Sequence, residues 1–236
     1  MTTIPSEKDL LAAACHFGHP KEKWNPKMKP FLYGTQKGIH VFDLVQTRKH
    51  LEELVQHLRK FQAEGKTILL VSTKQQSVHL LERLGKKLGQ PVVTKKWIPG
   101  LITNWATLKK RLQYYKDLRK GFVTGEVEKF TKKEQTALRK KLAKLDSGLA
   151  GVAEMSGLPQ ALFVVDALRD NVAVKEARKM GIPVFGICDS NADPDEFACF
   201  VPCNDDATKS VEIILATIER SLADLRPQQD DEEEAA

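Results

Sequence analysis

Four aspartates lie at or just after the ends of two short apolar segments, where they could hold a divalent cation. Asp166 is near the end of ALFVVDA, and Asp189 ends IPVFGICD, with Asp193 and Asp195 close behind it. The carboxyl ends of parallel strands meet at one edge of a sheet, where ligands usually bind. Carboxylates at this edge could bind Mg²⁺ and support phosphoryl transfer. One hypothesis is therefore an α/β enzyme that uses Asp166, Asp189 and Asp193.

The motifs that accompany such enzymes are missing from the sequence. No strand-like segment is followed by G-x-G-x-x-G or by G-x-x-x-x-G-K-[ST], and G-x-S-x-G does not occur. Aspartate at a strand end more often caps a helix or shapes a turn. We therefore expect no catalytic residue, no cofactor and no small-molecule substrate.

Histidine and cysteine offer a second possible chemistry, metal binding. His16 and His19 are three residues apart beside Cys15, and Cys199 and Cys203 are four apart. Neither group shows the paired C-x₂-C spacing that is specific for zinc. We expect no metal, although Asp189 with Asp193 and His16 with His19 stay open as ligand pairs. We expect the cysteines, which also include Cys188, to be reduced thiols.

Short apolar segments alternate with amphipathic segments over most of the chain. The expected strands are 38–44, 66–73, 91–94, 161–167, 182–189 and 198–202. The expected helices are 6–14, 46–63, 75–88, 171–181 and a last one from about residue 205. Nearly unbroken apolar strands that alternate with helices are typical of a parallel sheet with helices on both faces. The fold class is therefore α/β.

The middle of the chain departs from this alternation. Leu138, Leu142, Leu145, Leu149 and Val152 recur at spacings of four and three, which is typical of a heptad seam. The seam follows T-K-K-E at residues 131–134, the pattern of a capping box. We therefore expect an antiparallel coiled-coil hairpin over residues 104–152, inserted into an α/β domain formed by residues 1–103 and 153–225.

The charge distribution predicts a polyanionic partner. The formal net charge is +6 even though five acidic residues lie in the last seven positions. Residues 104–148 hold thirteen basic side chains against five acidic ones. Clustered lysine and arginine displace counterions from phosphate, so RNA contact is favoured over a merely solvated helical surface. We expect the acidic tail, residues 226–236, to be disordered.

Neither a membrane nor export is expected. No segment approaches the roughly 20 apolar residues that span a bilayer. The first residues, MTTIPSEKDLLAAAC, contain acidic side chains and lack the apolar core of a signal peptide. The cytoplasm is therefore the expected compartment.

Several segments, in order along the chain, closely resemble the bacterial-type small-subunit ribosomal protein two family. They are HFGH, WNPKMKPFLYG, TNW, FTKKE, GLPQALFVVDA, AVKEARKMGIPVFGICDSNADPD and NDDA. The resemblance runs from about residue 8 to residue 222. It implies a flavodoxin-like sheet with an inserted coiled-coil hairpin, and a non-enzymatic place in the small ribosomal subunit. It also implies binding to small-subunit rRNA, to neighbouring ribosomal proteins and, in bacteria, to the large mRNA-binding protein one.

The rRNA-binding residues expected on this basis lie in three places. The first segment has lysines for phosphates and aromatic rings for bases, although Trp24, Phe31 and Tyr33 could equally pack on the sheet. The second place is a loop before the hairpin, and the third is the hairpin itself. The expected residues are Lys21, Lys23, Trp24, Lys27, Lys29, Lys95, Lys96, Trp97, Asn104, Lys109, Lys110, Arg111, Lys132, Lys133, Arg139 and Lys140.

The sequence departs from the family pattern at a few positions. Lys95 and Lys96 replace a usual His-Arg pair, and lysine cannot reproduce the bidentate phosphate contact of arginine. Pro99 and Cys203 each replace a usual glycine.

Besides the enzyme, one further alternative function stays open. It is an adaptor protein whose hairpin grips a partner helix, and association that is insensitive to salt would be its sign.

Overall fold

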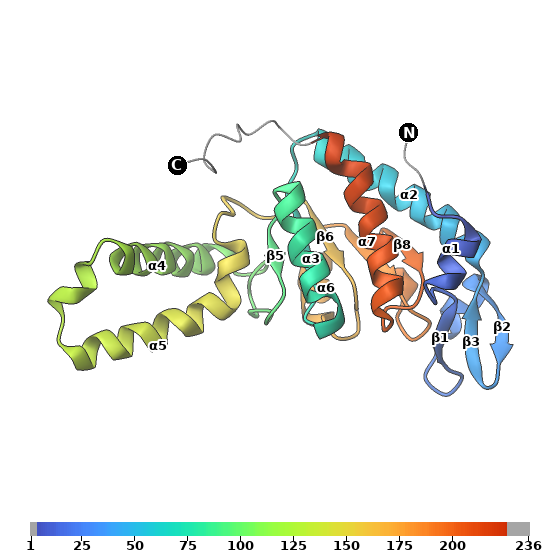
Figure 1. Cartoon of the computed structure of the whole chain (residues 1–236), viewed down its shortest axis with the longest axis horizontal. Coiled ribbons are helices and arrows are strands. Elements are labelled where there is room, and N and C mark those ends of the chain that lie inside the picture. The colour runs from blue at the N-terminus through green and yellow to red at the C-terminus, as the bar shows by residue number, and fades with distance from the viewer. Residues whose placement is uncertain (1–3, 226–236) are drawn as a thin grey trace.

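The computed structural model describes residues 4–225, so the expected disorder of the tail lies outside the described residues. Figure 1 shows a central sheet covered by helices, a pair of helices projecting from one side, and a small sheet at the opposite side. Among the described residues, no helix is both long and apolar enough to cross a bilayer.

The central sheet has five parallel strands in the order β5-β4-β6-β7-β8. The strands are β4 (Ile68–Val71), β5 (Val92–Val93), β6 (Ala161–Val164), β7 (Val184–Cys188) and β8 (Cys199–Pro202). Every residue of β4, β6 and β7 is buried. Strands of this kind must be covered on both faces, as their unbroken apolar sequences predicted.

Helices α1 (Glu7–Ala12), α2 (Leu44–Ala63), α3 (Gln75–Leu88) and α7 (Thr208–Leu222) cover one face of the sheet. Figure 1 shows α3 and α7 side by side in front of the strands. The start of α1 is fixed by a capping box between Ser6 and Asp9, and α3 ends at Gly89, whose positive φ of 65° favours glycine. The expected helix 75–88 is confirmed at both ends.

Helix α6 (Asn171–Lys179) covers the other face together with the loop before α4 and the ends of the two projecting helices that lie nearest the sheet. Ala173, Val174 and Ala177 of α6 pack on this face with Leu162 and Val164 of the sheet. The α/β class, with helices on both faces of a parallel sheet, is thereby confirmed.

The projecting pair consists of α4 (Trp105–Val123) and α5 (Lys132–Leu149), which we call the arm. The 3₁₀ turn η2 (Glu126–Lys129) joins them, and η3 (Ala150–Val152) leads back toward the sheet. The expected capping box is present between Thr131 and Glu134. Leu108, Leu112 and Tyr115 are buried with Leu149 and Val152 in the core of the second face, which anchors the base of the arm.

A second, antiparallel sheet lies at the side opposite the arm (Figure 1). Its strands, in the order β1-β3-β2, are β1 (Phe17–Pro20), β2 (Leu32–Gln36) and β3 (Ile39–Phe42). The 3₁₀ helix η1 (Pro26–Phe31) lies between β1 and β2, and η4 (Pro194–Glu196) and η5 (Ala223–Leu225) occur later. A small core of Met28, Phe42, Cys188, Ala192 and Phe200 joins this sheet to the main one.

Candidate functional site

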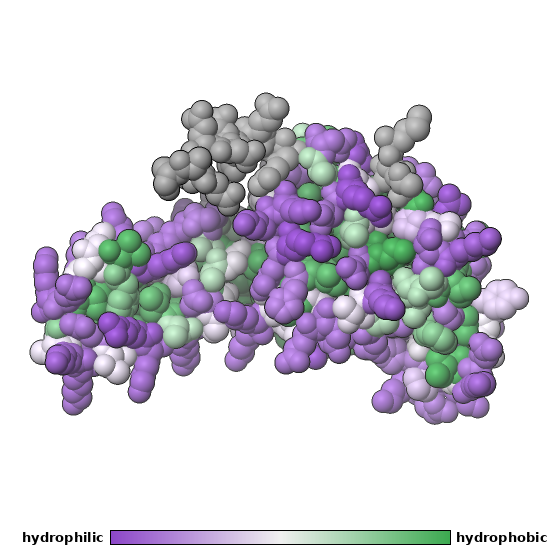
Figure 2. All heavy atoms as spheres, in the orientation of Figure 1, coloured by the Kyte–Doolittle hydropathy of each residue, from purple (hydrophilic) through white to green (hydrophobic). Residues whose placement is uncertain are grey.

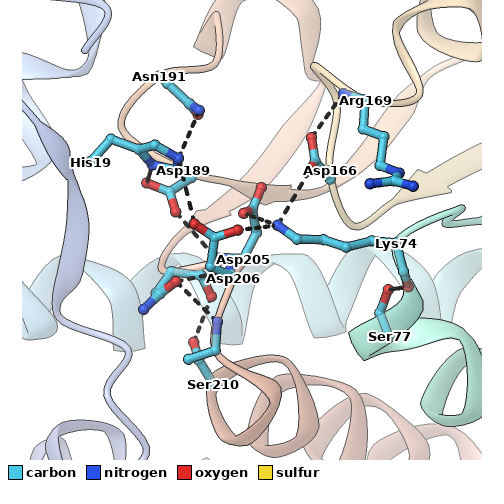
Figure 3. Close-up of polar contacts among 12 residues, drawn as sticks. His19, Lys74, Ser77, Asp166, Arg169, Asp189, Asn191, Asp205, Asp206 and Ser210 are labelled. Carbon is cyan, nitrogen blue, oxygen red and sulfur yellow. Dashed lines mark hydrogen bonds and ion pairs between the residues drawn. The ribbon is translucent and has the colours of Figure 1, made fainter. Parts of the chain in front are cut away.

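The expected gathering of acidic residues at the carboxyl edge of the sheet is present, but a lysine occupies its centre. Lys74, just before α3, is 6% exposed. Its Nζ lies 2.6 Å from Oδ1 of Asp205, 2.6 Å from Oδ1 of Asp206 and 3.3 Å from Oδ2 of Asp166. Figure 3 shows the side chain reaching from the start of α3, where Lys74 is the N-cap, to these carboxylates. Its ammonium group lies where a divalent cation would have to bind to Asp166 and Asp205.

The electrostatics of this cluster favour a charged lysine. Burial opposes the charged form of Lys74, but Asp205, Asp206 and Asp166 outweigh it and raise its pKa above the ordinary value. Burial, with the neighbouring charges of Asp189 and Asp166, raises the pKa of Asp205 to about 7, against the opposing effect of Lys74. The cluster therefore resembles a buried structural ion-pair network more than a set of metal ligands.

His19 joins the small sheet to this edge. Its Nδ1 lies 3.0 Å from Oδ1 of Asp189, and its backbone N–H donates to Oγ of Ser190 at 2.7 Å. The bond to Asp189 raises the pKa of His19, although burial opposes this. Figure 3 shows the ring between Asp189 and Asn191, on the side of the cluster away from Lys74. These contacts hold β1 to the residues that directly follow β7.

His19, Asp189 and Asp206 are one group whose side-chain types could hold a metal ion, with one ligand atom each within 4.8 Å of the others. Two possible ligand pairs were left open from the sequence, Asp189 with Asp193 and His16 with His19. In the structure, His19 and Asp189 lie beside each other. Asp193 instead binds Lys27, with 2.8 Å between its Oδ2 and Nζ. Nδ1 of His16 is buried without a hydrogen-bond partner among the described residues. All four cysteine thiols are free.

The arm exposes its predicted RNA-binding residues. Seven of them are exposed and form no ion pair within residues 4–225: Lys109, Lys110, Arg111, Lys132, Lys133, Arg139 and Lys140. Two further cations of the arm are engaged: Lys116 pairs with Glu154 at 3.0 Å, and Lys141 lies 4.4 Å above the ring of Tyr114. Figure 2 shows long hydrophilic side chains projecting from the arm, with hydrophobic ones between its two helices.

The small sheet and its 3₁₀ helix carry the first group of predicted residues. Lys21, Lys23 and Lys29 are exposed without an ion pair in the described part of the chain. Lys27 differs, because it also pairs with Asp195 at 2.6 Å. To contact RNA, Lys27 would therefore have to give up its ion pairs with Asp193 and Asp195.

The aromatic residues of this segment behave differently from one another. Trp24 is half-buried, with its ring centroid 4.6 Å from that of His40. Phe31 packs edge-on against His50 and Phe200. Tyr33 is 84% exposed, which leaves its ring free for stacking.

The loop between β5 and α4 is organised around a buried carboxylate that sequence reasoning missed. Glu176 of α6 is 8% exposed, and five donors point at its two oxygens. They are the amides of Gly100, Ile102 and Thr103, the hydroxyl of Thr103 and Nε1 of Trp97, at 2.8–3.1 Å. Nothing in the sequence indicated that Glu176 is buried or that its partners come from the loop before α4.

This network corrects the prediction for Trp97. The side chain is 7% exposed and its indole donates to Glu176, so it packs in the core instead of facing a base. Lys95 and Lys96, in the same loop, are exposed, and Lys95 lies 3.8 Å from Asp146. Asn104 is exposed at the N-cap of α4, where its side chain makes no capping hydrogen bond.

Replacing Glu176 with glutamine should lower the free energy of unfolding at pH 7 by about 2–4 kcal/mol, because a carboxamide cannot accept all five hydrogen bonds. Burial opposes ionisation of Glu176, yet these bonds hold its pKa below the usual value. The wild-type contribution should therefore be present above the unfolded-state pKa and fade as pH falls through the lower folded-state pKa. Urea titrations at about pH 7 and about pH 3.5, followed by tryptophan fluorescence, measure both effects. If the difference in free energy of unfolding between the wild type and Glu176→Gln did not shrink at the lower pH, this would contradict the charge argument.

Together these observations describe a structural α/β protein with a basic helical arm. The acidic groups at its sheet edge serve mainly to join segments of the chain. Residues 10–224 match the family model described as Ribosomal protein S2. The small ribosomal subunit protein uS2 of a Nitratiruptor species is 43% identical over 206 residues, which cover 87% of this chain and 77% of that relative.

The chain belongs to the ribosomal protein S2 family. The family resemblance and the expected absence of enzymatic activity are thereby confirmed, since this family is structural and not enzymatic. The hypothesis of an α/β enzyme is set aside for the same reason. The expected location in the small ribosomal subunit also follows from family membership.

Proposed function

We propose that this chain is a structural constituent of the small ribosomal subunit, and that it binds the subunit's rRNA through the arm and the basic loops. The observation that carries the proposal is that twelve of the arm's thirteen cations, including the seven predicted ones, are exposed and lack an ion-pair partner within residues 4–225. Unpaired lysine and arginine on a projecting pair of helices are suited to phosphate contact.

The arm acts in this proposal as a separate unit, the coiled-coil insertion of residues 104–152, mounted on the α/β domain of residues 1–103 and 153–225. The buried contacts of Leu108, Leu112 and Tyr115 hold its base on the main core. Its farther half is free to lie along RNA. Lys21, Lys23, Lys29, Lys95 and Lys96 would add phosphate contacts from the body.

Protein neighbours complete the proposed role. In the subunit, the chain would contact neighbouring ribosomal proteins and, in bacteria, the large mRNA-binding protein one. The half-exposed hydrophobic side chains Leu11, Phe17 and Val45, which are 53%, 43% and 59% exposed, support such contacts near the small sheet and the start of α2.

Sedimentation of cell lysate through a sucrose gradient tests the proposal. The chain should travel with the small subunit at low magnesium, and with whole ribosomes at high magnesium. A chain that stays with free proteins at both magnesium concentrations would contradict it.

A further inference from the structure

A recess of about 250 Å³ lies at the carboxyl edge of the sheet, beside the loop that leads to the arm. Its walls come from three segments: the turn after β4, the loop after β5, and the residues just before and within the first turn of α6. Three cationic side chains line it, Lys95, Lys96 and Arg169. The recess adjoins the Lys74 cluster, but Lys74 does not line it.

Arg169 is held at this recess without an ion-pair partner in the described part of the chain. Its Nε donates to Oγ1 of Thr73 at 3.1 Å, and its backbone N–H donates to Oδ1 of Asp166 at 2.9 Å. The guanidinium forms no ion pair within residues 4–225, and Figure 3 draws no line from it to a carboxylate. A fixed guanidinium with free Nη groups can bind a phosphate through two parallel hydrogen bonds.

The acidic side chains near the recess leave it positive. Asp170 is the one carboxylate in its lining, and this residue is 3% exposed. Its oxygens accept from the amide and the hydroxyl of Thr73 at 3.0 and 2.9 Å, so they are already occupied. The ion pair between Lys95 and Asp146 is long, at 3.8 Å, and exposed on both sides. Exposed pairs of this kind are weak and yield readily to a stronger anion.

The outer wall of the recess is rigid before any ligand arrives. Trp97 lines the recess and donates to Glu176, which also binds the amide of Gly100. This network fixes the loop that carries Lys95 and Lys96. A preformed anion site loses less conformational entropy on binding than a flexible one.

We propose that this recess binds a phosphate group of the rRNA backbone, with Arg169 supplying the bidentate contact and Lys95 and Lys96 adding charge. The inference deepens the proposed function and rests on it. It adds Arg169 to the proposed RNA-binding residues. A free phosphate compound has the same chemistry and is distinguished by experiment.

The main experiment measures binding of the full chain to small subunits that have been stripped of it with high salt. Arg169→Ala should bind about tenfold more weakly at physiological salt. The slope of log affinity against log salt should fall by about one. The affinity of Arg169→Lys should lie between those of the wild type and Arg169→Ala, because lysine keeps the charge but lacks the planar geometry of the guanidinium. Arg48→Ala is the matched control, since Arg48 is exposed on α2, which packs on β8 at the opposite edge of the sheet.

The outcomes separate the two proposals. If the wild-type chain binds and Arg169→Ala equals Arg48→Ala in affinity and slope, the recess assignment fails while the proposed function stands. If the wild-type chain does not rebind stripped subunits, the proposed function fails and the inference fails with it.

The source of the phosphate is tested on the free, isotope-labelled chain through the Nε–H resonance of Arg169. Titration with a single-stranded RNA oligonucleotide should shift this resonance at lower concentration than titration with inorganic phosphate. A response that saturates first with inorganic phosphate would overturn the RNA assignment in favour of a free phosphate compound. No response to either titrant would overturn the site itself.

Discussion

Replacing Lys74 with methionine should lower the free energy of unfolding by about 3–5 kcal/mol, because it removes the cation from a buried pair and leaves its acidic partners uncompensated. Lys74 is 6% exposed and lies 2.6 Å from Asp205, itself 4% exposed. Methionine keeps most of the volume and the unbranched shape, so the loss measures charge more than packing. Urea unfolding at about pH 8, followed by circular dichroism, gives the value.

Two comparisons show whether this loss comes from burial. Lys27→Met removes a lysine that also has two carboxylate partners, Asp193 and Asp195, but its side chain is 50% exposed. Solvent already screens the ammonium group of Lys27, so Lys27→Met should lower the free energy of unfolding far less than Lys74→Met does. Adding Asp205→Asn to Lys74→Met should restore part of the stability, because it removes the most buried unpaired acid. Equal losses for the two lysines would contradict the argument.

The pH dependence of the Lys74→Met protein has a defined sign. Burial and the charges of Asp189 and Asp166 already raise the pKa of Asp205, and removing Lys74 removes the opposing effect. A carboxyl group whose pKa is higher in the folded state binds protons there, so stability falls as pH rises toward that pKa. The loss in the variant should therefore be largest at about pH 8 and should shrink toward about pH 5.

The main sheet could be predicted because its strands are buried on both faces. A strand such as Ile68–Val71 must then be apolar at every position, and this is visible in the sequence without knowledge of its neighbours. The same holds for Ala161–Val164 and Val184–Cys188. The capping box at Thr131 is local in sequence and was predicted for that reason.

Of the small sheet, only β3 (Ile39–Phe42) was predicted, as the expected strand 38–44. Strands β1 and β2 are short and partly exposed, and the pairing of each with β3 contains a register shift, so they were not predicted. The anchors of the small sheet are distant in sequence, as in the bond between His19 and Asp189 across 170 residues. No strand was expected before residue 38, so the strands on either side of η1 were found only in the structure.

The acidic edge was predicted in position but not in partners. Asp166 and Asp189 do lie at the same edge, as the rule for parallel strands requires. Lys74 was missed because the sequence shows only a lysine in a polar turn, and its burial depends on Asp205 from the far end of the chain. Trp97 was misplaced for the same reason, since its partner Glu176 is 79 residues away.

Removing four cations from the arm should weaken binding to stripped small subunits at physiological salt by about 10²–10³-fold and should flatten the salt dependence. We choose the exposed residues Lys109, Lys110, Arg139 and Lys140, all changed to glutamine. Each cation that neutralises a phosphate adds about 0.7–0.9 to the slope of log affinity against log salt, so four contacts remove about three. Glutamine preserves helix propensity, so the arm should keep its helical content.

A matched variant separates local contact from net charge. Lys60, Lys86, Lys175 and Lys179 are exposed on the body and form no ion pair within the described residues. Changing these four to glutamine alters the net charge equally, and long-range attraction should fall by a similar amount. Only the arm variant should lose the steep part of the salt slope, because only its cations touch phosphate in the bound state. If the wild-type association were insensitive to salt, the arm would instead hold a protein partner, as in the adaptor alternative. If only the body variant lost its affinity and its salt dependence, the RNA contact would lie on the body and the proposed role of the arm would be wrong.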